Sequence, residues 1–447
     1  MSNTFSIRPI NCTQQYTLKY INDIIHCETI LINFIQGSVW KEKQKKHDSQ
    51  CVLPIFLFFD DYEIGNPLGS HSGVHKLGAV YISIPCLPPH IQSTLKTIFL
   101  ALLFHSTDRQ KFGEQGIDIE SNGELTNIKF ELGLILGDNL GIHSITGFVE
   151  SFSANYPCRM CKVHKDIMRK QCYVDETLIR QVDDYNFDLI ENNVSSSGVS
   201  GICVWNDVRG FKIFDHVGVD MMHDLLEGVM KYDLSFLISY YVLELKLFSL
   251  EVLNNRIISF DYGPDKGSKP SVLNMDHICK NTIRLSASEM MSLVRYFGLL
   301  IGDFVPQNEP VWHLYLSLRK ILDILTSTSF QKECSKLLQT LVAEHNELYL
   351  ILSKNNLKPK YHYLLHYHTM MLKFGPLINL WSMRFEAKHR ISKIAANTSS
   401  NRRNICKTLA IKHQLQLNHL FLKGTLGRNI ELSPPQSVVD IEINTTR

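Results

Sequence analysis

Two short apolar segments that finish on aspartate constrain the fold more than any other feature of this sequence. Val52 to Phe59 is a continuous apolar run followed at once by Asp60 and Asp61, and the alternating segment from Thr126 to Leu136 is followed by Asp138. Apolar runs of this length and pattern indicate buried strands. The sequence therefore predicts a sheet in which two separate strands each deliver a carboxylate at their ends.

The remainder of the chain predicts helices around and after this sheet. Residues 76–89 alternate and indicate another strand, whereas residues 93–107 read as a helix. From about residue 219 to residue 352, apolar side chains recur with helical spacing. We therefore expect an α/β fold in which roughly two hundred mostly helical residues separate the strand-rich start from the C-terminal part.

Positive charge is concentrated near the C-terminus. The chain as a whole has a formal net charge of only +2, but residues 353–428 contain fourteen Lys and Arg and one acid, Glu386. Glu386 falls in a predicted helix from Ser382 to Ala396, about one turn before Arg390. This excess of cations suits a phosphate backbone, although part of it can be a solvated helix face. The side chains expected to contact phosphates are Arg384, Lys388, Arg390, Arg402 and Arg403.

Cysteine usage and hydropathy bear on the cellular setting. The eleven cysteines are scattered apart from one close pair, and the first residues lack an apolar signal core, so we expect a reducing, intracellular environment. The most apolar stretch, residues 234–253, contains Glu244, Lys246 and Glu251. Because a bilayer penalises such charges, this stretch predicts a buried helix and no membrane span.

Asp60 or Asp61, Asp138 and Glu386 are candidates for one catalytic metal site. Enzymes that transfer phosphoryl groups with two divalent ions hold the metals about 3.5–4 Å apart between converging carboxylates. The ordinary alternative is that acids after strands are turn residues. Glu386 is harder to explain in that way, because it is the one acid in a strongly basic stretch.

Cys158 and Cys161 have the spacing of half a tetrahedral zinc site. The chain contains no second Cys-x-x-Cys, but His362 and His366 are four residues apart, which on a helix places both imidazoles on one face. A thioredoxin-like redox pair needs a strand-to-helix setting that is lacking around residue 158. A deaminase site is a further alternative, because Pro-Cys-x-x-Cys is the second half of its signature, but we do not favour it.

A third cluster lies in the segment DMMHDLLEGV. Asp220, His223, Asp224 and Glu227 are spaced three and four apart, so they share one side of a helix. Asp220 and His223 are therefore candidates for an accessory role in binding metal or nucleic acid. The simpler interpretation is an amphipathic helix capped by Asp220.

These segments, in this order, resemble the transposases of the CACTA (En/Spm) class, which include many transposon-derived proteins of animal genomes. The matching stretches run from Leu53 to about Gln416: FFDDYEIGNPLGSHSGVHKLGAVY, LGLILGDNLGIHSITGFVESFSANYPCRMC, VDMMHDLLEGV, GPLINLWSMRFEAKH and NICKTLAIKHQL. The order is also similar to that in the catalytic subunit of the V(D)J recombinase, where a Cys-x-x-Cys follows the second Asp and a His pair precedes the Glu.

The resemblance implies a ribonuclease H-like mixed-sheet catalytic core with an Asp, Asp, Glu triad, interrupted by a long, mostly α-helical insertion. The triad falls on Asp60, with Asp61 as the close alternative, on Asp138 and on Glu386. It would hold two Mg²⁺ or Mn²⁺ ions. A structural Zn²⁺ would be bound by Cys158, Cys161, His362 and His366.

The same resemblance suggests how the chain is divided. The expected parts are a short N-terminal remnant (1–50), the first part of the core with the Asp strands and the Cys pair (51–165), the helical insertion (166–357), the second part of the core (358–430) and a flexible tail (431–447). Such transposases usually carry a DNA-binding region before the first strand, whereas only about fifty residues precede it in this sequence. We therefore expect a truncated or inactive copy.

The expected function is that of a DNA transposase, which cleaves transposon ends and transfers the strands to target DNA in the nucleus, as a homo-oligomer. The first alternative is a domesticated, non-catalytic DNA-binding or scaffold protein that keeps the zinc site. The second is a helical, zinc-dependent interaction protein without a nucleic-acid partner.

Overall fold

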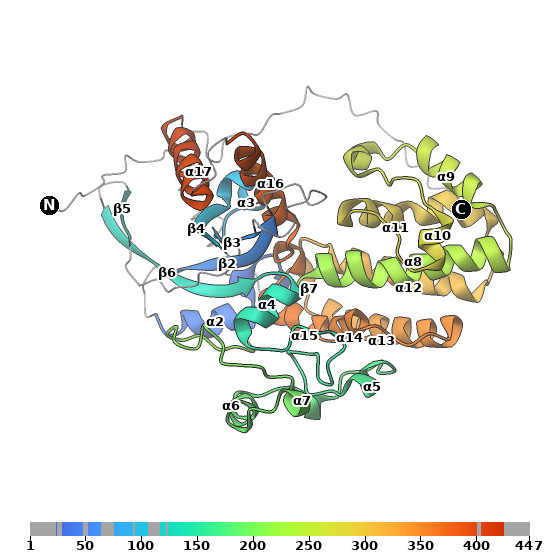
Figure 1. Ribbon diagram of the computed structural model, residues 1–447, viewed down its shortest axis with the longest axis horizontal. Coiled ribbons are helices and arrows are strands. Elements are labelled where there is room, and N and C mark those ends of the chain that lie inside the picture. The colour runs from blue at the N-terminus through green and yellow to red at the C-terminus, as the bar shows by residue number, and fades with distance from the viewer. Residues whose placement is uncertain are drawn as a thin grey trace.

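The computed structural model describes residues 24, 29–47, 52–63, 76–92, 94–105, 117–121, 124–399 and 404–423. Much of the expected N-terminal part (1–50) and all of the expected tail (431–447) lie outside these residues. Figure 1 shows a sheet flanked by C-terminal helices at one end of the molecule and a helical lobe at the other. A third group of short helices lies beside them.

The sheet has five strands in the order β4-β3-β2-β6-β5. Its central strand β2 runs parallel to β6, and the other neighbouring pairs are antiparallel. The strands are β2 (Val52–Glu63), β3 (Lys76–Ser83), β4 (Phe99–His105), β5 (Ile117–Ser121) and β6 (Glu124–Leu136). The chain is thus a mixed α/β protein, as expected from the sequence.

Asp60 and Asp61 do not follow a strand but belong to one. The strand β2 continues to Glu63, because the segment stays paired with β3, with Asp60 opposite Ala79 and Asp61 opposite Gly78. Asp138, by contrast, follows the end of β6 as predicted. The parallel pairing of Phe58 with Leu136 brings this end of β6 beside the acids of β2.

The prediction of a helix at residues 93–107 is wrong. Leu95–Thr97 form a short 3₁₀ turn and Phe99–His105 form β4, which pairs with β3 and contacts the C-terminal helix α17 (Ile405–Leu422). A continuous apolar run is compatible with a strand or a buried helix, so periodicity alone does not decide between them.

A short segment, residues 216–218, pairs with β6 beside its C-terminal end. The backbone N–H of Ile135 donates to the carbonyl of His216 over 2.8 Å, and the N–H of Gly218 donates to the carbonyl of Ile135 over 2.9 Å. These bonds form a parallel bridge between Ile135 and Val217. The chain leaves the sheet here and enters the π-helical segment η4 (Met222–Val229) through Asp220.

Helices occupy most of the chain between η4 and the C-terminal part. They are α8 (Met230–Ser239), the π-helical segment η5 (Tyr240–Glu244), α9 (Leu250–Ser259), α10 (Met275–Cys279), α11 (Ala287–Ile301), α12 (Pro310–Leu325), α13 (Cys334–Ser353), α14 (Pro359–Leu365) and α15 (Tyr367–Phe374). The two-stranded pair of β1 (Ile30–Leu31) and β7 (Phe330–Gln331) joins this lobe to the N-terminal part. Among the described helices, none is both long and apolar enough to cross a membrane.

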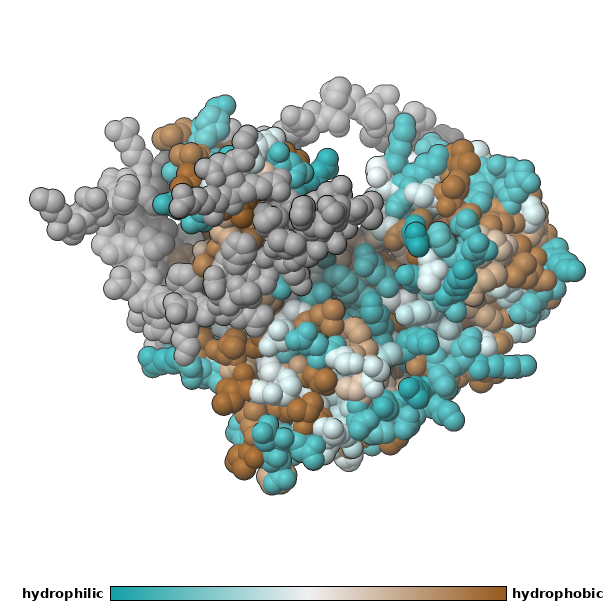
Figure 2. Space-filling view, in the orientation of Figure 1, coloured by the Kyte–Doolittle hydropathy of each residue, from teal (hydrophilic) through white to brown (hydrophobic). Residues whose placement is uncertain are grey.

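Short elements connect β6 with η4. They are α4 (Asn139–Thr146), α5 (Lys165–Met168), α6 (Val182–Glu191) and α7 (Val194–Ser197). Figure 2 shows brown, apolar patches on the surface in the region of α6, where the Phe187 and Ile190 side chains are exposed. The region between residues 158 and 180 is nevertheless well packed, because Cys158, Met160 and Val163 belong to the main hydrophobic core.

Candidate acidic site and metal centre

The strand β2 turns Asp60 toward the helix α16 (Met383–Asn397). Side chains alternate along a strand, so Phe58, Asp60 and Tyr62 share one face and Asp61 faces the other way. Phe58 stacks on Phe385 with ring centroids 4.3 Å apart, and Tyr62 stacks on His389 at 4.4 Å. Because Phe385 and His389 belong to α16, Asp60 lies on the face that this helix covers and Asp61 on the opposite face.

His389 is the direct neighbour of Asp60 on α16. Its Nδ1 lies 3.5 Å from Asp60 Oδ2, and burial lowers the pKa of His389 to about 3, so the imidazole is neutral near pH 7. A neutral ring at this distance contacts the carboxyl group of Asp60 without adding positive charge to the site. His389 was not predicted from the sequence, although it lies one helical turn after Glu386 and shares a side of the helix with it.

Asp138 interacts both with the backbone of α4 and with the acid on β2. It is the N-cap of α4, where its Oδ1 accepts a hydrogen bond from the backbone N–H of Gly141 at 2.6 Å. This is the ordinary structural role that acids after strands often have. The same carboxylate also contributes to the raised pKa of Asp60, so it lies close enough to interact with the acid on β2.

The structure brings Asp60, Asp138 and Glu386 together. Burial raises the pKa of Asp60 to about 8, and the charges of Asp138 and Glu386 add to this rise. Burial also raises the pKa of Glu386; His223 opposes this rise, and the charges of Asp220, Glu227 and Asp138 add to it. Carboxylates that oppose one another's ionisation are those that a bound cation would stabilise most.

Asp220 and His223 lie beside Glu386. His223 Nδ1 is 2.5 Å from Asp220 Oδ2, and His223 Nε2 is 3.6 Å from Glu386 Oε1 and 4.0 Å from Glu227 Oε2. Burial lowers the pKa of His223, but the hydrogen bond that its ring donates to Asp220 and the surrounding acids raise it to about 9 overall. A protonated His223 is therefore held between carboxylates at the edge of the site.

Asp220 also fixes the start of the helix that carries Glu386. Its Oδ1 accepts hydrogen bonds from the backbone N–H groups of Met222 and Ser382, and its Oδ2 accepts one from the Ser382 hydroxyl. The Asp220 side chain is almost completely buried. Asp220 therefore bonds the start of a helix, as expected from the sequence. The same carboxylate positions both His223 and α16.

We expect Asp220→Ala to lower the free energy of unfolding by about 3 kcal/mol, because it leaves buried donors of Ser382 and His223 without an acceptor. Urea denaturation followed by circular dichroism measures this loss. Asp276→Ala is the matched control, since Asp276 is exposed in the first turn of α10 and should change stability by less than about 0.5 kcal/mol. Equal stability of the two variants would contradict this role of Asp220.

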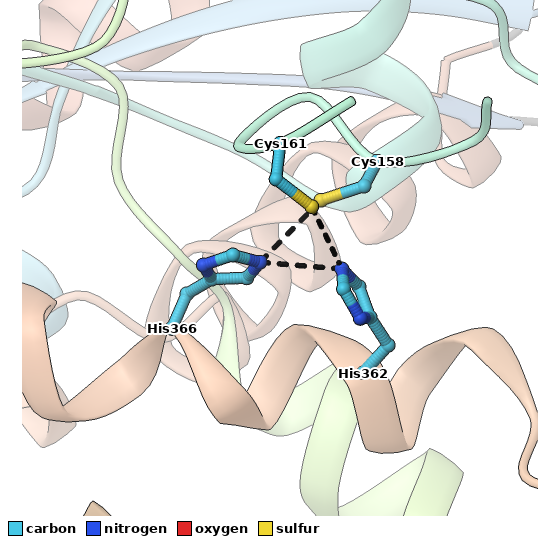
Figure 3. A group of neighbouring side chains, drawn as sticks. All are labelled: Cys158, Cys161, His362 and His366. Atoms are coloured by element: carbon cyan, nitrogen blue, oxygen red, sulfur yellow. Dashed lines mark hydrogen bonds between the residues drawn. The ribbon is translucent and has the colours of Figure 1, made fainter. Parts of the chain in front are cut away.

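Cys158, Cys161, His362 and His366 form a buried cluster (Figure 3). Their ligand atoms all lie within 4.8 Å of one another. The Cys161 Sγ to His362 Nε2 distance is 3.2 Å, the Cys158 Sγ to His366 Nε2 distance is 3.7 Å, and the two Nε2 atoms are 3.2 Å apart. A tetrahedral zinc ion with its usual bond lengths places such N and S atoms about 3.3–3.6 Å apart. The four side chains could therefore hold a metal such as zinc.

The surroundings of the cluster favour the metal-binding state of His366 and Cys158, whereas the hydrogen bond with Cys158 and burial raise the pKa of Cys161. Burial lowers the pKa of His366, which keeps the imidazole neutral. Burial opposes ionisation of the Cys158 thiol, but hydrogen bonding from Cys161 and the nearby imidazoles bring its pKa well below the ordinary value. Arg180 Nε donates to the carbonyl of Cys158, and the Tyr363 hydroxyl donates to that of Pro157. The Cys-x-x-Cys turn is thus fixed in position.

A buried polar chain connects this centre with the acidic site. Arg159 donates to Asn139 Oδ1 at 2.7 Å, Asn139 donates to Asp224 Oδ1 at 2.6 Å, and the Tyr367 hydroxyl donates to Asp224 Oδ2 at 2.8 Å. Asp224 is therefore occupied by structural contacts and not directed at Glu386. No sequence pattern points to Arg159 or Tyr367, because neither position belongs to a spacing rule for ligands.

The predicted DNA-binding cations differ in their positions. Arg384 donates to the carbonyl of Gln92 and Lys388 Nζ to that of Leu95 at 2.8 Å, so both side chains hold a loop against α16. Burial lowers the pKa of Lys388 to about 8. Arg390 is exposed. Arg402 and Arg403 lie outside the described residues.

Comparison with known proteins gives no assignment. No family model matches this chain, and no curated protein matches it. The resemblance to transposases therefore rests on the residues of this chain alone.

Proposed function

We propose that this chain is the catalytic region of a DNA transposase with a ribonuclease H-like core, which cuts and joins DNA at Asp60, Asp138 and Glu386. One observation carries the proposal: three acids far apart in the sequence lie close together, since Asp138 and Glu386 both raise the pKa of Asp60 and Asp138 also raises that of Glu386. The parallel pairing of β2 with β6 and the helix α16 above the sheet support it further.

The three acids offer the donors that Mg²⁺ and Mn²⁺ prefer. Burial raises the pKa of Asp60 most, and the charges of Asp138 and Glu386, which such ions would offset, raise it further. Two bound ions would supply activation of water and stabilisation of the charge on the transferred phosphate. The side chains of the protein would hold the acids in position. His389 contacts Asp60, Asp220 fixes the start of α16 and the ring of His223, and the N-cap bond from Gly141 orients Asp138.

In the same proposal, zinc at Cys158, Cys161, His362 and His366 has a structural role. All four ligands come from the protein and are buried, which is typical of structural rather than catalytic zinc. The ion would join the segment after Asp138 to the segment before Glu386. The protein would act in the nucleus as a homo-oligomer on transposon ends and target DNA.

The test is nicking of a supercoiled plasmid in the presence of Mn²⁺, which requires no knowledge of the terminal repeat. We expect Asp138→Asn to reduce nicking at least about a hundredfold, because the amide removes a metal-binding charge. Asparagine is as good an N-cap as aspartate, so the melting temperature should stay unchanged. Asp175→Asn is the matched control, because Asp175 also caps a helix, through the N–H of Thr177, but lies far along the chain from the acids.

Nicking by the wild type and by Asp175→Asn, but not by Asp138→Asn, supports the transposase proposal. Background nicking by all three proteins would reject it. The domesticated, non-catalytic DNA-binding protein would then be the better description, provided that the wild type still binds DNA.

A further inference from the structure

A basic groove lies next to the metal centre, on a part of the molecule that the proposed chemistry does not use. Lys165 and Arg169 from the α5 region line one side, and Lys358 lines the other. Phe152, Met168 and Leu357 contribute apolar surface, and the last two are buried. None of the described residues that line the groove is acidic.

The cations of the groove have only weak partners within the protein. Lys165 Nζ donates to the carbonyl of Ser153 at 3.3 Å, and Arg169 forms an exposed ion pair with Asp166 at 3.2 Å. Exposed pairs of this kind contribute little, so the charge of Arg169 stays available to an anion. The side chain of Lys358 is exposed. Arg384 and Lys388, by contrast, are engaged with backbone carbonyls.

The two walls of the groove are far apart in the sequence but held in fixed positions. The backbone N–H of Leu357 donates to the carbonyl of Arg169 at 2.9 Å. Cys161 lies four residues before Lys165 and His362 four residues after Lys358, so the metal centre joins the two walls directly. The positions of the three cations are therefore set by the fold and not by loose surface loops.

The groove is also connected to the acidic site. Lys360, two residues after Lys358, donates through Nζ to the backbone carbonyl of His223 at 2.7 Å. The ring of His223 lies 3.6 Å from the carboxylate of Glu386. A duplex held at the acids could thus continue across α14 to the groove. We propose that Lys165, Arg169 and Lys358 bind backbone phosphates of the DNA duplex that flanks the cut.

This inference rests on the proposed function for its partner, but it makes a separate prediction about affinity. Each lost phosphate contact reduces the salt dependence of binding to duplex DNA by about one ion. Replacing Lys165, Arg169 and Lys358 together by Gln should therefore reduce the slope of log K against log salt by about two to three. Affinity at moderate salt should fall at least about tenfold.

The experiment measures fluorescence anisotropy of a labelled duplex of arbitrary sequence with the full chain, at several salt concentrations. The control replaces Lys266, Lys280 and Lys320, three exposed lysines of the helical lobe, by Gln, which removes the same charge elsewhere. Melting temperatures of both triple variants show that they fold like the wild type. We expect the control to keep a slope within about one ion of the wild type.

Two results would overturn the inference. One is an equal loss of affinity and slope in both triple variants, which would show that the groove cations contribute only through the overall surface charge. The other is no loss in the groove variant. Neither result affects Mn²⁺-dependent nicking that Asp138→Asn abolishes, so failure of the groove and failure of the proposed function are distinguishable. Absence of any DNA binding by the wild type would reject both.

Discussion

Cys158→Ser is expected to release the metal and to abolish cooperative unfolding of the region around residues 158–180 and α14. Serine is a poor ligand for zinc, and structural zinc sites contribute apparent binding energies of about 10–16 kcal/mol. This is as large as the whole stability of a typical domain, about 5–15 kcal/mol. Because Cys158 is completely buried, the remaining three ligands would also lose their partner in the core.

Elemental analysis of the purified protein and thermal denaturation measure the two effects. We expect about one zinc ion per wild-type chain and almost none in the variant. Cys279→Ser is the matched control, since Cys279 is a free and exposed cysteine and its loss should change neither quantity. If the variant does not fold, titration of the wild-type thiols with a mercurial in the presence of a zinc indicator still tests the site. A wild type that contains no zinc contradicts the assignment.

The sequence predicted the four residues of the buried Cys and His cluster, but not the reasons for their positions. The spacing of Cys158 with Cys161, and of His362 with His366, was sufficient to identify the cluster that the structure brings together. The choice between Asp60 and Asp61 could not be made from the sequence, because it depends on which face of β2 the helix α16 covers. Stacking of Phe58 on Phe385 places Asp60 on the face that α16 covers, and that contact joins positions far apart in the chain.

Other features follow from tertiary packing alone. The apolar run at residues 98–104 forms the strand β4 because it pairs with β3, and no local pattern distinguishes this from a buried helix. Asp233 and His345 form a completely buried pair at 2.8 Å, and the Tyr361 hydroxyl donates to the same carboxylate. These contacts connect helices α8, α13 and α14. Isolated polar residues on apolar helix faces give no signal of such partners before the helices are packed.

Asp60→Asn is expected to stabilise the protein in the absence of added Mn²⁺ or Mg²⁺, and only at high pH. Burial and the neighbouring acids raise the pKa of Asp60 to about 8, above its ordinary value of 3.8. The folded state therefore holds a proton that the unfolded state releases, and stability falls as the pH rises from about 4 to about 8. Asparagine removes this penalty. We expect a gain of about 2–4 kcal/mol at pH 8.5 and almost none at pH 4.

Divalent metal should reverse the order of stability. Mn²⁺ bound between Asp60, Asp138 and Glu386 would offset their mutual repulsion, so it should raise the melting temperature of the wild type at pH 8.5 and leave Asp60→Asn almost unchanged. Asp61→Asn is the control, because Asp61 lies on the opposite face of β2 and should retain the response to Mn²⁺. A response lost in Asp61→Asn but kept in Asp60→Asn would assign the first acid to Asp61. An equal response in all three proteins would show that Mn²⁺ binds elsewhere, since only the acid whose carboxylate faces α16 can share an ion with Glu386.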